Sequence, residues 1–224
     1  EFDKAKKMFA FHELFNYQLK LQLQNINSRI EDNRYCVGVN KKDIDEFKNS
    51  LPFTLTGAQS RVIDEIVEDL NNPYKMDRLL QGDVGSGKTA VAAATLYVTI
   101  KAGYQTAIMA PTEILANQHF ETFFEFFKDL NISVALLTSS TPKKERNTIL
   151  SLLEVGEIEL LIGTHSLIQE DVKFNNLKYV ITDEQHRFGV KQRQLLSNKG
   201  EAVNSLMMTA TPIPRSLAIT LITD

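Results

Sequence analysis

Eight residues, from Gly82 to Thr89, have the types and spacing of a phosphate-binding loop. The pattern is Gly-x-x-x-x-Gly-Lys-Thr; it follows the apolar pair Leu79-Leu80 and precedes an alanine-rich helical pattern that begins at Ala90. Glycines let backbone N–H groups turn inward toward phosphate oxygens, and the following helix adds the positive end of its dipole. The lysine of such a loop reaches the β- and γ-phosphates and the hydroxyl ligates Mg²⁺, so the pattern predicts a nucleoside triphosphate with Mg²⁺. The residues expected to contact it are Gly82, Gly85, Ser86, Gly87, Lys88 and Thr89.

The phosphate loop requires a partner carboxylate at the end of another buried strand, where it would hold the metal from the far side. The apolar run 179–182 is followed at once by Asp183 and Glu184. Successive side chains of an extended backbone point to opposite faces, so two adjacent carboxylates suit two different roles. We expect Asp183 and Thr89 to be metal ligands and Glu184 to orient or deprotonate the attacking water. The alternative is that the two carboxylates only mark the solvated turn where a buried strand surfaces. The predicted catalytic residues are Lys88, Asp183 and Glu184.

Three further polar segments follow predicted strands: APTEILANQH after Ile108-Met109, GTHSLIQ after Leu161-Ile162 and TATPIPR after Met207-Met208. Several polar clusters at the strand ends of one sheet predict a single working edge. Upstream, Thr56 and Gln59 lie at the start of a predicted helix over 58–70, and their spacing also fits a simple capping box.

The elements that must position these residues alternate regularly along the chain. Short β-rich runs separate longer helical patterns, which is typical of βαβ units with a parallel sheet covered on both faces. We therefore predict an α/β fold, a phosphate-loop domain with a central, mostly parallel sheet flanked by helices. The aromatic run 120–127 has helical spacing and is predicted to pack in the core. The six predicted strands are DRLLQ, QTAIMA, ISVALLT, IELLIG, KYVIT and SLMMT.

The N-terminal residues show a different pattern. Apolar residues at helical spacing predict an amphipathic helix between Lys4 and Ile30, and residues 31–50 are polar and irregular. We divide the chain into a helical linker, 1–50, and an α/β domain, 51–224. The chain begins at Glu1 rather than Met and stops at the segment LITD, so we expect a piece of a longer protein.

The composition excludes several classes of protein. A net charge of −3 provides no global basic surface for nucleic acid, although basic groups can be local. The lone Cys36 cannot form an internal disulfide, and the scattered histidines have no zinc-type spacing. No apolar run approaches the roughly 20 residues that span a bilayer, and no signal-peptide pattern is present.

Taken together, these motifs resemble the motor of superfamily 2 helicases. The glutamine motif would be 53–59, DEQH at 183–186 resembles motif II, and TATPIPR resembles motif III. Five longer strings are similar to those of the bacterial RecG-type helicases: LLQGDVGSGKT, MAPTEILANQH, IGTHSLIQEDV, DEQHRFGVKQR and MTATPIPRSLA.

The motor of transcription–repair coupling translocases is a near alternative, but that family usually has Glu at the position of Gln185. A phosphate-loop switch or regulatory ATPase would have no use for GTHSLIQ or TATPIPR. Ser139 stands where the RecG-type family prefers Gly.

The resemblance implies an ATP-dependent DNA helicase that remodels forks and four-way junctions in recombination and repair, with ATP and Mg²⁺ as cofactors. It also implies that residues 51–224 are the first of two RecA-like motor domains and that residues 1–50 come from the linker after a missing wedge domain. Without the second domain's arginine we expect weak hydrolysis, so the isolated chain could act only as a nucleotide- and DNA-binding module. The intact protein would be a monomer on branched or duplex DNA in the bacterial cytoplasm, associated with the nucleoid and with no membrane. The implied roles are adenine recognition for Phe53 and Gln59, coupling for Gln185, His186, Thr209 and Thr211, and the single-strand path for Thr112, Glu113, Thr164 and His165.

Overall fold

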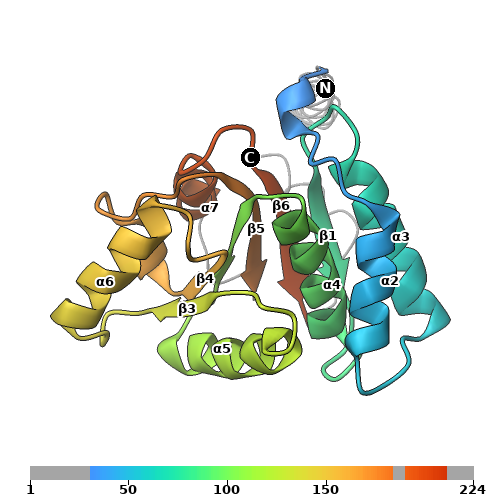
Figure 1. Cartoon of the computed structure of the whole chain (residues 1–224), viewed down its shortest axis with the longest axis horizontal. Helices are drawn as coiled ribbons and strands as arrows, with labels where there is room; N and C mark the ends of the chain where they lie inside the picture. The colour runs from blue at the N-terminus through green and yellow to red at the C-terminus, as the bar shows by residue number, and fades with distance from the viewer. Residues whose placement is uncertain (1–30, 184–189, 211–224) are drawn as a thin grey trace, which may run out of the picture.

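The computed structural model describes residues 31–183 and 190–210 of the chain, and a six-stranded sheet forms its centre (Figure 1). The strand order is β1-β6-β5-β2-β4-β3, and each neighbouring pair is parallel. The predicted RecA-like α/β fold is therefore confirmed, and among the described strands the sheet is wholly rather than mostly parallel. The six predicted strands are all present, as β1 (Asp77–Gln81), β2 (Gln105–Met109), β3 (Val134–Leu137), β4 (Leu160–Gly163), β5 (Leu177–Asp183) and β6 (Asn204–Thr209).

Helices cover both faces of the sheet (Figure 1). One core cluster joins β-strand side chains such as Ile108 and Ile181 to helices α2 through α5. The alternate side chains, such as Met109 and Val180, pack with α6 and α7 on the other face. Because side chains alternate along a strand, each central strand serves both cores and reads as a continuous apolar run. The helices are α2 (Lys41–Ser50), α3 (Gly57–Leu70), α4 (Lys88–Lys101), α5 (Glu113–Phe127), α6 (Lys143–Glu154) and α7 (Val190–Ser197), with short 3₁₀ turns η1 (Asn33–Tyr35) and η2 (His165–Ile168).

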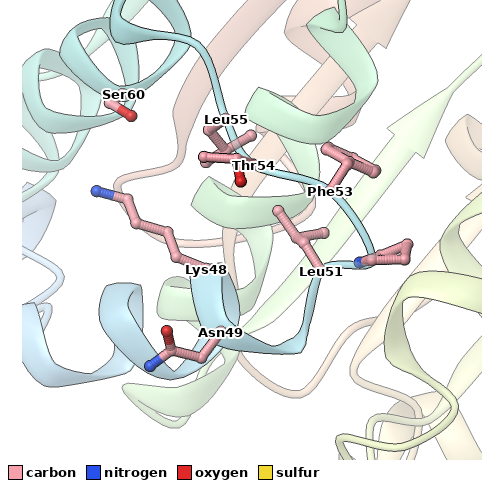
Figure 2. Close-up of a pocket in the computed structure, with 8 residues that line it drawn as sticks. Lys48, Asn49, Leu51, Phe53, Thr54, Leu55 and Ser60 are labelled. Atoms are coloured by element: carbon pink, nitrogen blue, oxygen red, sulfur yellow. The ribbon is translucent and has the colours of Figure 1, made fainter.

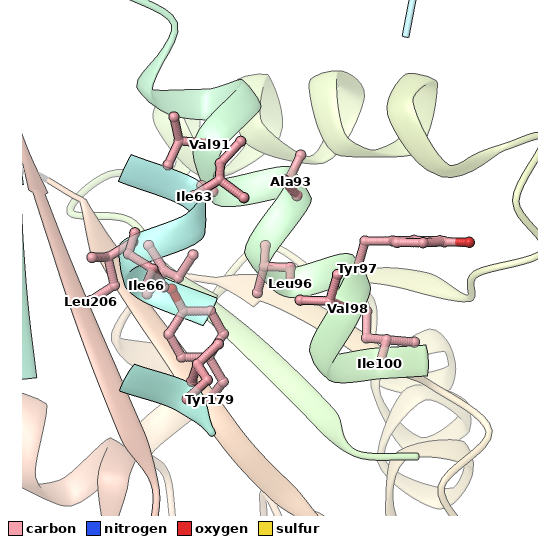
Figure 3. Packing of buried hydrophobic residues seen from close by; sticks show 14 of the residues in the cluster. Ile63, Ile66, Val91, Ala93, Leu96, Tyr97, Val98, Ile100, Tyr179 and Leu206 are labelled. Carbon is pink, nitrogen blue, oxygen red and sulfur yellow. The ribbon is translucent and has the colours of Figure 1, made fainter. Parts of the chain in front are cut away.

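Helix α4, which follows the phosphate loop, is the central helix of the first core. Every residue from Ala90 to Ile100 is buried, so this helix is enclosed on all sides rather than exposed along one face. Ile63 and Ile66 of α3 belong to the same cluster as Leu96 of α4 (Figure 3). A helix enclosed in this way holds the loop at its N-terminus in a fixed position.

The aromatic run 120–127 lies on α5, and the prediction that it packs in the core is only partly right. Phe123 and Phe127 are fully buried, whereas Phe124 is 48% exposed. Residues 123 and 124 are about 100° apart around a helix, so both cannot face the sheet. Phe124 instead contacts Phe120 along the outer side of α5, with ring centroids 6.0 Å apart.

Residues 37–50 share the core of the α/β domain. Phe47 of α2 is fully buried, and its ring lies 5.4 Å from that of Tyr97 on α4. Ahead of α2, the Val37 amide donates to the Leu70 carbonyl at 2.7 Å. The domain boundary near Leu51 stays a prediction, but side chains on both sides of it form one cluster. The predicted linker helix between Lys4 and Ile30 lies outside the described residues.

The segment before α2 is attached to the amino ends of β5 and β6. Lys178, near the start of β5, donates to the Arg34 carbonyl, and Asn204, at the start of β6, donates to the Tyr35 carbonyl at 2.9 Å. Burial lowers the pKa of the Lys178 ammonium group. The N-terminal part of the described chain is thus fixed at the amino edge of the sheet, the edge away from the carboxyl ends of the strands. None of the described helices has the length and apolarity needed to span a membrane.

Candidate nucleotide site at the carboxyl edge of the sheet

The parallel sheet brings the predicted site residues to one edge. The phosphate loop follows β1, Asp183 ends β5, and Thr209 ends β6, which lies between β1 and β5 in the sheet. The Gly82 amide donates to the Thr209 carbonyl at 3.3 Å, so the start of the phosphate loop is bonded to the end of β6. The described residues of the predicted site therefore lie at one edge of the sheet, and their role there stays a prediction.

The phosphate loop depends on glycine at particular positions. Gly85 and Gly87 have positive φ angles of 79° and 81°, which residues with side chains rarely adopt. A Cβ atom at Gly87 would lie 2.0 Å from Nε2 of Gln59, and one at Gly82 would lie 2.7 Å from Oγ of Ser86. A side chain at either position would displace Ser86 or Gln59, and glycine leaves the loop backbone free to approach phosphate closely.

The lysine and the helix that follow the loop fit a phosphate group. Nζ of Lys88 donates to the carbonyls of Gly82 and Asp83, at 2.6 and 2.8 Å, so its ammonium group lies inside the curve of the loop. Helix α4 begins at Lys88 with Gly87 as its N-cap and without a side-chain capping bond. Its first amides therefore have no side-chain acceptor and suit an anion. Thr89 is the second residue of this helix, where a hydroxyl can serve as a metal ligand.

Gln59 takes part in a capping box and also contacts the phosphate loop. Its side-chain Oε1 accepts from the Thr56 backbone amide at 2.8 Å, and its backbone amide donates to Thr56 Oγ1 at 3.2 Å. At the same time its Nε2 donates to the Ser86 carbonyl at 3.0 Å. The capping interpretation left open by the sequence is correct, and it coexists with a direct contact to the loop. Adenine recognition by Gln59 stays a prediction.

Phe53 lies at a hollow of about 430 Å³ beside the start of α3 (Figure 2). Its side chain is 45% exposed, and its ring makes an edge contact with Phe126 of α5, with centroids 6.4 Å apart. An exposed aromatic face beside a hollow can stack on a planar base. The hollow is lined by Lys48, Asn49, Leu51, Pro52, Phe53, Thr54, Leu55 and Ser60.

Asp183 contacts a residue that sequence reasoning missed. Its Oδ2 lies 2.7 Å from Nε2 of His119, a residue of α5. The two side chains are only 15% and 12% exposed. A lone histidine within a helical pattern carries no spacing signal, so only the fold reveals this pair. Four predicted residues lie outside the described part of the chain, namely Glu184, Gln185, His186 and Thr211.

The predicted single-strand path begins at α5, where Glu113 makes an unexpected set of contacts. Thr112 is the N-cap of α5, and its Oγ1 accepts from the Leu115 amide at 3.3 Å. The Glu113 carboxylate accepts from both hydroxyls of Ser139 and Ser140 and from the Ser140 amide. These hydrogen bonds hold the pKa of Glu113 below its ordinary value. Glu113 therefore joins α5 to the loop after β3, a contact that the sequence did not indicate.

The other two residues of the predicted path lie after β4 and differ in exposure. Thr164 is buried, and its hydroxyl has no hydrogen-bond partner among the described residues, whereas His165 is exposed at the start of η2. Of the two, only His165 presents its side chain to solvent. Across residues 31–183 and 190–210, no three His, Cys, Asp or Glu side chains gather into a metal cluster.

Comparison with known proteins agrees with this arrangement. The family model described as DEAD/DEAH box helicase matches residues 56–219, which include the phosphate loop and the ends of β5 and β6. The chain belongs to the DEAD/DEAH box helicase family. Within these helicases, the RecG resemblance predicted from the motifs is confirmed by the relatives that follow.

The chain is 53% identical to the ATP-dependent DNA helicase RecG of Bacillus subtilis (strain 168) over 216 residues, which is 96% of this chain. It is 52% identical to the RecG protein of Staphylococcus epidermidis (strain ATCC 12228 / FDA PCI 1200) over the same length. The chain spans about a third of these curated relatives, 32% of each.

Two solved structures of helicases are also similar to this chain. A structure of RecG bound to a three-way DNA junction matches 98% of this chain and 29% of that one, with 47% identity and a TM-score of 0.80. A hypothetical ATP-dependent RNA helicase from Sulfolobus tokodaii matches 82% of this chain and 54% of that one, with a TM-score of 0.61. At 16% identity the second likeness concerns the fold alone.

Proposed function

We propose that this chain is the first motor domain of an ATP-dependent DNA helicase of the RecG type. The observation that carries the proposal is the common edge at which the phosphate loop, Asp183 and Thr209 meet. A sequence identity of 53% to a RecG helicase supports the assignment to this type over the transcription–repair coupling translocases. The intact protein would act on branched DNA at the bacterial nucleoid, as a monomer.

ATP would bind at this edge with its phosphates against the loop. Lys88 would exchange its bonds to the loop carbonyls for phosphate oxygens, and the amides at the start of α4 would hold the same group. Phe53 and Gln59 would hold the adenine. Mg²⁺ with Thr89 and Asp183 as its protein ligands would neutralise charge on the phosphates. Glu184 would then orient the attacking water.

DNA would lie across the ends of β2, β3 and β4. Thr112 and His165 are open enough to reach a phosphate backbone, and the loop at Ser139 and Ser140 adds hydroxyls beside them. Glu113 would hold that loop against α5 rather than contact DNA itself, because a carboxylate repels phosphate. Thr209, bonded to the phosphate loop, is proposed to couple the two sites.

The proposal is tested by ATPase assays on the isolated chain and on the full-length protein, each with and without a three-way DNA junction. We expect slow turnover by the chain alone, with little stimulation by DNA, because an arginine from a second motor domain is worth about 10³–10⁵ in rate. The full-length protein should hydrolyse ATP rapidly when the junction is added. Brisk DNA-dependent hydrolysis by the isolated chain would contradict the claim that rapid turnover requires a second motor domain. A full-length protein whose ATPase activity is not stimulated by the junction would refute the helicase function.

A further inference from the structure

His119 and Asp183 form a close and largely buried pair at the edge of the sheet. The distance from Nε2 to Oδ2 is 2.7 Å, and neither side chain is more than 15% exposed. An ionised carboxylate only accepts hydrogen bonds, so in the tautomer with the proton on Nε2 the imidazole is the donor to Asp183. A short hydrogen bond to a charged acceptor in a poorly solvated place is among the stronger kinds.

The surroundings of His119 fix the direction of this donor. Its ring lies against Phe123, one turn further along α5, with centroids 6.0 Å apart. Phe123 is fully buried and belongs to the core cluster beneath the sheet's first face. Asp183 follows Ile181 on that same face of β5, because alternate residues of a strand point the same way. The imidazole is therefore held by packing and is not a freely rotating surface side chain.

We propose that His119 is a positioning residue for Asp183, and that its Nε2–H fixes the carboxylate in the orientation needed to ligate the metal of the nucleotide complex. The inference rests on the proposed function, since it assigns a supporting residue to the same site. Metal-binding side chains are commonly oriented by a second hydrogen-bonding partner, whose loss weakens metal affinity roughly 10–100-fold. A carboxylate at the end of a strand has a rotatable side chain, and a hydrogen bond to one oxygen selects one orientation.

The same helix also connects Asp183 to the predicted DNA path. Glu113, in the first turn of α5, holds the loop at Ser139 and Ser140, and His119 follows six residues later. At 1.5 Å per residue the two contacts are about 9 Å apart along one rigid helix. A displacement of α5 at its DNA end would therefore move the donor that holds Asp183.

Matched variants of the 224-residue chain separate the hydrogen bond from ring packing. His119→Phe keeps a ring against Phe123 but removes the donor. His119→Asn has an amide donor on a side chain that is too short to reach Asp183. His119→Gln places an amide N–H at about the distance of the histidine Nε2. Glu121→Gln, exposed on the same helix, is the control. Mn²⁺ binding to each chain with a non-hydrolysable ATP analogue is measured by electron paramagnetic resonance, and thermal unfolding without nucleotide reports folding.

The Phe and Asn variants should bind Mn²⁺ about 10–100-fold more weakly than wild type, while His119→Gln and Glu121→Gln remain close to it. Nucleotide binding in the absence of metal should be unchanged in all four. If His119→Phe does not fold, the comparison of Asn with Gln carries the test. Unchanged Mn²⁺ affinity in folded Phe and Asn variants would overturn the role of His119 alone. A wild-type chain that binds no Mn²⁺ nucleotide would overturn the nucleotide site itself, and the role of His119 with it.

Discussion

The side-chain amide of Gln59 donates to the Ser86 carbonyl at 3.0 Å, and so joins the start of α3 directly to the phosphate loop. The same side chain completes the capping box with Thr56. Gly87 lies so close to Gln59 that a Cβ atom there would collide with it. Gln59 thus has two effects that can be separated. It stabilises the start of α3, and it holds the phosphate loop through the Ser86 carbonyl.

The pair Thr56 and Gln59 allows these two effects to be measured apart. Thr56→Ala removes the hydroxyl of the capping box, and Gln59→Ala removes the opposite half together with the bond to Ser86. Each variant should lose about 1 kcal/mol of unfolding free energy in urea titrations. Only Gln59→Ala should also weaken binding of a fluorescent ATP analogue, by about tenfold. Equal loss of nucleotide affinity in both variants would show that Gln59 acts only as a cap.

Glu113 predicts a pH-dependent contribution to stability. Hydrogen bonds from Ser139 and Ser140 lower its pKa below the ordinary value of 4.5, so the unfolded chain binds the proton more tightly. The stabilisation is therefore complete above pH 4.5 and is lost as the pH falls through the lower pKa of the folded state. Urea unfolding of wild type and Glu113→Gln should differ most near about pH 7 and converge in acid. A difference that stays constant, or grows, as the pH falls would contradict this account.

Phe47 tests whether the residues before Leu51 are integral to the domain. Its ring is fully buried against Tyr97 and lies 6.1 Å from that of Phe127. Phe47→Ala should therefore lower the unfolding free energy by about 3–5 kcal/mol. Lys42→Ala, on the exposed side of the same helix, should change it by less than about 0.5 kcal/mol. A small effect of Phe47→Ala would mean that α2 is only loosely attached.

Glu184 lies outside the described residues, and its predicted role gives a separate test. Glu184→Gln in the full-length protein should bind ATP as well as wild type, because the amide preserves size and removes only the base. Turnover should fall by about 10²–10⁴, the range for a positioned acid or base. For Glu184→Gln, a hydrolysis assay should show almost no ATP turnover, and a titration should show unchanged ATP affinity. Undiminished hydrolysis would refute the assignment.

The fold and the nucleotide loop could be predicted because local patterns determine them. Parallel strands buried on both faces appear as short apolar runs, and the glycines of the loop are required by backbone geometry at Gly85 and Gly87. Once the strands are known to be parallel, the residues after each of them must lie at one edge. The placement of Asp183 and Thr209 follows from that alone.

The contacts between distant elements could not be predicted in this way. His119 reaches Asp183 only because β2 and β5 are neighbours, an order that no local spacing encodes. Glu113 was expected along the DNA path, but its hydrogen bonds to Ser140 depend on how the loop after β3 folds back toward α5. Phe47 fell on the linker side of a boundary drawn from polarity, yet its ring packs in the main core.

The most direct test of the account is calorimetric titration of ATP with Mg²⁺ into this chain and its Lys88→Ala variant, with Lys42→Ala as control. The ammonium group of Lys88 lies inside the loop, bonded to the Gly82 carbonyl, so its loss removes charge-assisted bonds to phosphate. Wild type and Lys42→Ala should bind one nucleotide, and Lys88→Ala should bind about 10–100-fold more weakly at unchanged thermal stability. Equal affinity in Lys88→Ala, or no binding by wild type, would contradict a nucleotide site at this edge of the sheet.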